Sequence, residues 1–198
     1  MVEWWKNLPK PRSGVANCHV TGLFSFIVNE DIRVFLTNDW TTLSVNFLGE
    51  VLGFHNHHRS ISIKVLNGEL LNIAPTMTYG VPHPCGFKPW EWDSLLRGGK
   101  GAFTPQEDEG LYVSNEFQTT HLDAKTPPHY MSASTFHTVQ QLTKRTAWAV
   151  REHGESSHQT TQNWSAKDLT KWHKYKNMYL PLSQASIHSL WPATFVDS

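Results

Sequence analysis

Two histidines, His55 and His57, stand two residues apart after an apolar run at 51–54. In a β-strand, side chains two residues apart lie on the same face, with Cα atoms roughly 6.5–7 Å apart. Imidazoles at that spacing can bind one metal ion. The segment that follows, 60–66, alternates apolar and polar residues and ends at Asn67-Gly68, a typical hairpin turn. The sequence therefore predicts a metal-binding pair at the mouth of a β structure.

A catalytic metal needs at least one more protein ligand. His137 is the first candidate, because residues 134–140 have a strand pattern and follow a turn at Pro127-Pro128. His121 and His129 precede that strand, and either could replace His137. Asp123 lies beside His121, and carboxylates complete many iron sites. The third ligand therefore stays open at this point.

Short strands with turn residues between them must position these histidines. The predicted strands are 22–28, 32–37, 41–48, 51–57, 60–66, 69–73, 111–117, 130–139 and 146–151. Strands so closely spaced, with no helices between them, favour an antiparallel barrel or sandwich. We expect a single domain over 1–198, with an arm at 1–18, a β core at about 20–155 and an insertion at about 75–110. The insertion would hold a short helix at 90–97, and 164–198 would hold a helix from Ser165 to about Tyr175 and an irregular tail.

The histidine pattern resembles the first motif of the cupin superfamily, a glycine, five residues and then His-x-His. Gly49, His55 and His57 meet that motif, and Gly68 closes the following hairpin. The second cupin motif contributes one more histidine from a later strand, which His137 matches. The resemblance implies an all-β cupin fold, a double-stranded β-helix or jelly-roll barrel, with minor helical decoration.

Within the cupins, the segments around His57 and His137 are most similar to the cysteine dioxygenase (thiol dioxygenase) group. That resemblance implies a three-histidine iron site at His55, His57 and His137. It also implies a substrate-carboxylate role for Arg33, although Arg33 could equally be an ordinary surface arginine. Arginine suits the first role because its planar fork binds a carboxylate through two hydrogen bonds. The tyrosine expected after His137 is missing, since Gly154 falls near its place, and so is its partner cysteine.

The resemblance implies Fe(II), with Mn, Ni or Zn as alternatives, and a mononuclear non-haem dioxygenase acting on a small thiol- or carboxylate-bearing molecule. Two other functions stay open. One is a redox-neutral metal-dependent isomerase or lyase, and the other is a non-catalytic ligand-binding or structural cupin. Dioxygen consumption separates the two enzymes, and a pocket filled by aromatic side chains would favour the non-catalytic protein.

Composition narrows the partners further. The 198 residues have a formal net charge of zero and two cysteines, Cys18 and Cys85. A neutral chain does not favour nucleic acid or an anionic membrane as a partner, and two distant cysteines do not make a disulfide scaffold. We find no apolar stretch long enough for a signal peptide or a membrane span, and expect a cytoplasmic protein. The cupin resemblance allows a homodimer paired through barrel edges.

Overall fold

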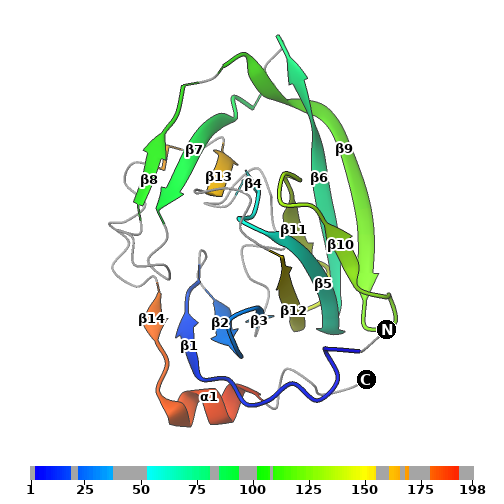
Figure 1. Cartoon of the computed structure of the whole chain (residues 1–198), viewed down its shortest axis with the longest axis vertical. Coiled ribbons are helices and arrows are strands. Elements are labelled where there is room, and N and C mark those ends of the chain that lie inside the picture. Colours follow the sequence, from blue (N-terminus) through cyan, green and yellow to red (C-terminus); the bar gives the residue numbers. More distant parts are fainter. Residues whose placement is uncertain are drawn as a thin grey trace.

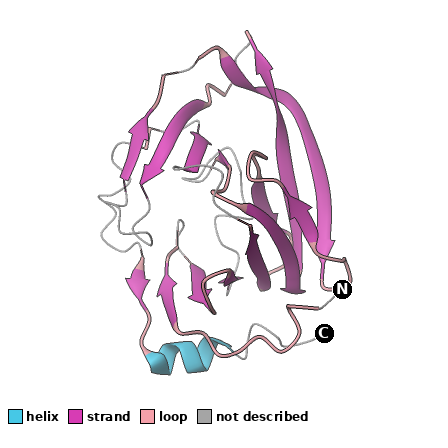
Figure 2. Cartoon of the chain, in the orientation of Figure 1, coloured by secondary structure: helices cyan, strands magenta, loops and turns pink. Residues whose placement is uncertain are grey.

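The computed structural model describes residues 3–18, 22–37, 53–80, 85–93, 102–107, 109–154, 161–165, 168–169 and 179–191. These residues form antiparallel strands and one short helix, which confirms the predicted all-β class (Figures 1 and 2). The strands belong to three sheets that curve around a common interior in Figure 1. None of the described helices is long and apolar enough to cross a membrane.

The largest sheet has seven strands in the order β10-β5-β12-β3-β2-β1-β14. Their bounds are β10 (His129–Met131), β5 (Ser60–Asn67), β12 (Thr146–His153), β3 (Ile32–Thr37), β2 (Leu23–Ile27), β1 (Ser13–Ala16) and β14 (Leu180–Pro181). The strands β2, β3, β5 and β12 match four predicted strands closely. Alternation along each strand separates the two faces of this sheet.

The outer face of the large sheet carries a hydrophobic cluster. Val34 and Leu36 of β3 are fully buried there. Helix α1 (Gln184–Leu190) covers the cluster through Ile187 and the following Trp191, and Trp4 packs against it from the predicted N-terminal arm. The tail that was predicted to be irregular therefore holds a helix. Ser183 caps that helix, with its side chain accepting a hydrogen bond from the backbone N–H of Ser186.

A second sheet has the order β11-β6-β9, with β11 (Thr138–Gln141), β6 (Glu69–Tyr79) and β9 (Leu111–Asp123). The Asn67-Gly68 turn joins β5 to β6, but the two strands lie in different sheets and do not form the predicted hairpin. Gly68 has φ +76°, and a Cβ there would lie 2.5 Å from the carbonyl oxygen of Arg145. The turn is therefore a tight corner between two sheets that requires glycine.

The third sheet has the order β4-β13-β7-β8, with β4 (Phe54–His55), β13 (Thr161–Ser165), β7 (Lys88–Asp93) and β8 (Ala102–Pro105). The helix predicted from residue 90 is wrong over residues 90–93, which belong to β7. Trp90 and Trp92 lie two residues apart and are both buried on one face, so the period of two prevails over the helical pattern.

Other predicted elements differ in extent or lie outside the description. The predicted strand 130–139 is two strands, β10 and β11, separated by a turn. Among its described residues, the predicted strand 51–57 contains only β4 as regular strand. The predicted strand 146–151 continues in β12 to His153, and β13 at 161–165 was not predicted. The predicted strand 41–48, the motif glycine Gly49 and most of the predicted helix from Ser165 lie outside the described residues.

Gly53 directly precedes β4 and provides a test of this arrangement. A Cβ at Gly53 would lie 1.7 Å from the backbone oxygen of Trp164 on β13, so alanine must push β4 away from its neighbour. We expect Gly53→Ala to lower the free energy of unfolding by about 3 kcal/mol or more, at the upper end of overpacking costs. Urea denaturation measures this. The control is Gly110→Ala, where φ is +80° but the space is open and the cost should be about 1–2 kcal/mol. Equal losses would contradict the close packing of β4 on β13.

Candidate metal centre

Three histidines meet where the second and third sheets come together. The imidazole nitrogens of His55, His57 and His137 that could bind an ion all lie within 4.8 Å of one another. The ring centroids are 5.1 Å apart for His55 and His57, 4.8 Å for His55 and His137, and 5.1 Å for His57 and His137. The structure therefore brings together the three histidines that the sequence predicted as ligands.

Backbone hydrogen bonds hold this cluster together. His55 and His137 form an isolated antiparallel bridge, in which each backbone N–H donates to the carbonyl of the other at 2.9 Å. His57 follows the end of β4, and its N–H donates to the Ala133 carbonyl at 3.3 Å. Asn56, the residue between His55 and His57, is held in place because its side-chain oxygen accepts a hydrogen bond from the Gln162 N–H at 2.8 Å. The two rings of His-x-His therefore converge without a regular strand.

The direction of His58 also follows from the early end of the strand. A regular strand through 51–57 would have turned His58 to the face opposite His57. The chain leaves the strand after His55, and His58 is buried and lines the same cavity as the three candidate ligands.

The cluster favours neutral imidazoles, the form that binds metals. Burial lowers the pKa of His55 to about 4. The pKa of His137 lies well below its ordinary value, first because of burial and then because His55, His57 and His129 would repel a positive charge. His55 and His137 can therefore offer a lone pair near neutral pH.

The nitrogen spacing fits a bound ion. His57 Nε2 and His137 Nε2 are 2.8 Å apart. Two nitrogens bound at about 2.0–2.1 Å to one ion would be about 2.8–3.4 Å apart for angles of 90–110°. His55 Nδ1 is buried and has no hydrogen-bond partner, so its ring is free of competing contacts at that atom. The donor set of three imidazoles suits Zn, Fe, Ni or Cu and does not identify the metal.

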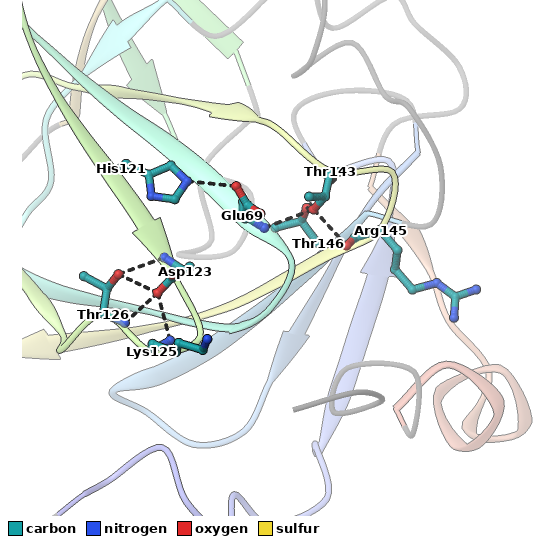
Figure 3. Close-up of polar contacts among 8 residues, drawn as sticks. All are labelled: Glu69, His121, Asp123, Lys125, Thr126, Thr143, Arg145 and Thr146. Atoms are coloured by element: carbon teal, nitrogen blue, oxygen red, sulfur yellow. Dashed lines mark hydrogen bonds and ion pairs between the residues drawn. The ribbon is translucent and has the colours of Figure 1, made fainter.

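The alternative ligands lie elsewhere. His121 on β9 pairs with Glu69 on β6, Nε2 to Oε2 at 2.9 Å, and both side chains are about half exposed (Figure 3). Asp123 closes a turn by accepting from the backbone N–H groups of Lys125 and Thr126 (Figure 3). Neither belongs to the cluster. His129 reaches the cluster only through an asparagine described next.

Asn72, on β6, contacts His137 from behind. Its Oδ1 lies 2.7 Å from His137 Nδ1, and its side chain is 2% exposed. The sequence analysis placed Asn72 in a strand without assigning it a role. The sequence does contain a signal for a buried Asn72, because it lies two residues after the apolar Leu70 and therefore on the same face of the strand, and Leu70 is fully buried.

One cavity of about 180 Å³ contains this cluster. Arg33 on β3, which was predicted either to bind a substrate carboxylate or to be a surface residue, lines the cavity from the large sheet. Most of the wall is apolar and aromatic, with Leu23, Phe35, Ile61, Ile63, Trp92, Phe103, Val139, Trp148 and Val150. An engineered cavity of about 150 Å³ holds benzene, so the space suits a molecule of similar or slightly larger size.

Two polar residues of the cavity were missed from sequence. The predicted strand 146–151 ends before Glu152, but β12 continues to His153, so Glu152 follows Trp148 and Val150 on the face toward the cavity. Continuing the alternation by one step would have found it. Asn163 on β13 is 1% exposed, and its Oδ1 has no hydrogen-bond partner among the residues that the structure describes. A buried amide oxygen in a cavity wall favours a ligand that donates a hydrogen bond.

Two side chains near Arg33, those of Cys18 and Tyr179, are uncharged at neutral pH. Burial raises the pKa of Cys18 to about 12, although Arg33 and Ser25 partly oppose the shift. Burial and the neighbouring Cys18 hold the pKa of Tyr179 well above its ordinary value. Both side chains therefore stay protonated at neutral pH. In the described part of the chain no carboxylate forms an ion pair with Arg33, so its charge has no protein counter-ion there.

Metal content tests the cluster directly. We expect the wild-type protein, reconstituted with a divalent metal, to hold about one ion per chain and the His57→Ala and His137→Ala variants to hold none. Elemental analysis after gel filtration measures this. His121→Ala is the matched control and should keep the ion, because His121 pairs with Glu69 outside the cluster. Equal metal loss in His121→Ala, or retention in His137→Ala, would contradict the assignment.

The two cysteines should differ in reactivity. A disulfide reagent reacts with the thiolate, and the buried Cys18 with a pKa of about 12 offers almost none, whereas Cys85 is exposed. We expect one thiol to react quickly in the native protein and two in guanidinium chloride, followed by absorbance of the released thiolate. Cys85→Ser should remove the fast reaction, and a fast reaction that survives in this variant would show that Cys18 is accessible.

Comparisons with known proteins place the chain in no family. No protein-family model and no curated protein sequence matches it. Two X-ray structures of L-ribose isomerase from Cellulomonas parahominis are similar to it in part. The structure with no ligand has a TM-score of 0.33 and 11% identity over 76% of this chain, and the structure with L-ribose has 0.34 and 13% over 80%. The chain spans 63% of the length of these isomerases. The proposals below therefore rest on the site.

Proposed function

We propose that this protein is a metal-dependent enzyme of the cupin type that catalyses a redox-neutral isomerase or lyase reaction on a small carboxylate-bearing molecule. One observation carries the proposal. The three histidines, a glutamate and an arginine that has no carboxylate partner in the described part of the chain line a single cavity of about 180 Å³. An ion-binding group, an anion-binding group and a proton-transfer group are thus within one small space.

The charge of Arg33 supports a carboxylate-bearing substrate. A guanidinium does not lose its proton in a protein, and Arg33 is half-buried with no carboxylate partner among the described residues. Cys18 and Tyr179 beside it remain neutral, so neither balances the charge. A substrate carboxylate would supply the missing counter-ion through two parallel hydrogen bonds. The aromatic wall around Arg33 strengthens that attraction by excluding water.

Glu152 supports a proton transfer. Its carboxylate reaches Arg59 Nε at 3.9 Å on one side and lines the cavity on the other, with 21% of its side chain exposed. In the proposed reaction Glu152 accepts a proton from a substrate carbon and returns it to the neighbouring atom, so no electrons are gained or lost. A divalent ion held by His55, His57 and His137 would supply Lewis-acid polarisation of a substrate oxygen. Asn163 would accept a hydrogen bond from a substrate hydroxyl.

A dioxygenase is the second candidate. Its support is the donor set, three neutral imidazoles with no carboxylate in the described cluster, as predicted for the cysteine dioxygenase group. The dioxygenase reaction does not need a carboxylate such as Glu152 in the cavity. We therefore rank the dioxygenase second. The non-catalytic protein ranks third, because the aromatic side chains line the cavity without filling it.

Solvent exchange tests the first candidate. The reconstituted protein is incubated in D₂O with short 2-hydroxy and 2-oxo acids. Proton NMR follows the loss of the proton signal as deuterium replaces hydrogen at the carbon beside the carbonyl. We expect exchange or conversion without dioxygen uptake, and Glu152→Gln should slow it by about 10²–10⁴-fold as expected for loss of a general base. Dioxygen uptake that requires the metal would replace this proposal with the oxygenase. Metal binding without any reaction would favour the non-catalytic protein.

A matched control separates the two sides of Glu152. Asp31→Asn removes the other carboxylate bound to Arg59, whose Nη1 is 3.3 Å from Asp31 Oδ1, without changing a residue that lines the cavity. We expect Asp31→Asn to keep wild-type activity.

Arg33→Gln should raise KM by about 10–100-fold, the cost of a lost charged hydrogen bond, with a smaller effect on kcat. A KM unchanged by Arg33→Gln would exclude Arg33 as the carboxylate anchor.

A further inference from the structure

We infer that Asn72 is a positioning residue that holds His137 in the tautomer protonated on Nδ1 and thereby aims the Nε2 lone pair at the metal position. The effect on metal binding rests on the proposed metal centre. The effect on the tautomer of His137 does not, because it follows from the hydrogen bonds of the protein alone. This difference allows the two ideas to fail separately.

The position of Asn72 is set by the second sheet. Asn72 lies opposite Val139 in the pairing of β6 with β11, two residues beyond the bridge residue His137. The Asn72 side chain is almost fully buried, and Oδ1 lies 2.7 Å from His137 Nδ1. An amide oxygen only accepts hydrogen bonds, so the proton between these atoms belongs to Nδ1 of the ring.

The far side of the amide fixes its orientation. Nδ2 of Asn72 lies 3.6 Å from the sulfur of Met131 and 3.4 Å from Nε2 of His129. A thioether has no proton to donate, so the group facing Met131 must be the NH₂ and not the oxygen. The opposite orientation would leave that oxygen against an acceptor and turn an NH₂ toward His137. Met131 therefore selects the orientation with Oδ1 toward His137, and His129 fits this orientation as an acceptor on Nε2.

The tautomer follows from this orientation. With its proton on Nδ1, His137 has a free lone pair on Nε2, the nitrogen that lies 2.8 Å from His57 Nε2. In the metal-free protein His57 would donate a proton to that lone pair, and a bound ion would take its place. Without Asn72, nothing among the described contacts of His137 Nδ1 would hold the proton there. The ring could then rotate or change tautomer, and the lone pair would be lost from the site.

The neutral amide also matters. A carboxylate at this position would make His137 a more basic ligand and would add a negative charge close to the ion, whereas asparagine leaves the ion more electrophilic. Three neutral ligands and a neutral partner give a centre that retains the full charge of the ion. Such a centre binds anions more tightly than the same centre with a carboxylate at position 72. The anionic substrate class proposed above therefore matches the choice of an amide at Asn72.

Nitrogen NMR of the metal-free protein tests the tautomer. Long-range proton–nitrogen spectra distinguish protonated from unprotonated ring nitrogens, and the His137 signals are assigned by their absence in His137→Gln. We expect the wild-type His137 to be protonated on Nδ1 and unprotonated on Nε2, and Asn72→Leu to lose that preference. A wild-type His137 protonated on Nε2, or an unchanged tautomer in Asn72→Leu, would overturn the inference whether or not the protein binds metal.

Zinc affinity, measured by competition with a chromogenic chelator, tests the consequence. We expect Asn72→Leu to bind Zn²⁺ about 10–100-fold more weakly, the usual cost of losing an outer partner of a ligand histidine. Asn72→Asp keeps the acceptor and should bind zinc at least as tightly as wild type, while azide, a probe for anion binding, should bind its zinc form more weakly. An Asn72→Leu affinity within twofold of wild type would overturn the inference.

A second variant controls for general destabilisation. Gln141 on β11 is 1% exposed and donates from Nε2 to the carbonyls of Thr143 and Lys144, away from the histidines. Gln141→Leu should lower the melting temperature of the protein and leave its zinc affinity unchanged. Equal loss of zinc affinity in Gln141→Leu and Asn72→Leu would show a structural effect and overturn the positioning role. Absence of zinc binding in the wild type would instead remove the proposed metal centre and leave the tautomer result standing.

Discussion

The reciprocal backbone pair between His55 and His137 is the constraint on which the site depends. It joins β4, in the third sheet, to the residue before β11, in the second, through two hydrogen bonds of 2.9 Å. A pair of this kind fixes both the separation and the direction of the two side chains, since both partners are held by the same two bonds. His57 joins them from the turn after β4. The cluster thus owes its geometry to main-chain contacts rather than to packing of the rings.

The large sheet separates stability from chemistry by its two faces. On β3, Val34 and Leu36 face the outer hydrophobic cluster beneath α1, whereas Arg33 lines the cavity. Strand β12 repeats the pattern, with Ala149 in the outer cluster and Trp148 in the cavity wall. One alternating sequence therefore builds a core and a binding surface at once. A charged residue is tolerated within such a strand because its neighbours bury the opposite face.

Local pattern predicted the candidate ligands but not what supports them. His-x-His and the strand near His137 are short-range features, and the strand that carries Arg33 was recognised with its observed bounds. Asn72 was not assigned a role, because its contact with His137 spans 65 residues of chain and depends on sheet pairing. The helix predicted from residue 90 is wrong over 90–93, because these residues pair with β13 on one side and β8 on the other. Long-range pairing, which a single sequence does not display, accounts for both.

The bridge also links site assembly to the folding order of the chain. His57 and His137 are 80 residues apart, and the neighbouring pairing of β3 with β12 joins Thr37 to Thr146 across 109 residues. Contacts of such high sequence separation incur a large loop-closure entropy and form slowly. A nascent or partly folded chain therefore has no preformed three-histidine site. Any ion that binds the native cluster would stabilise the native state by mass action, and the stability of distant sheet contacts would set its apparent affinity.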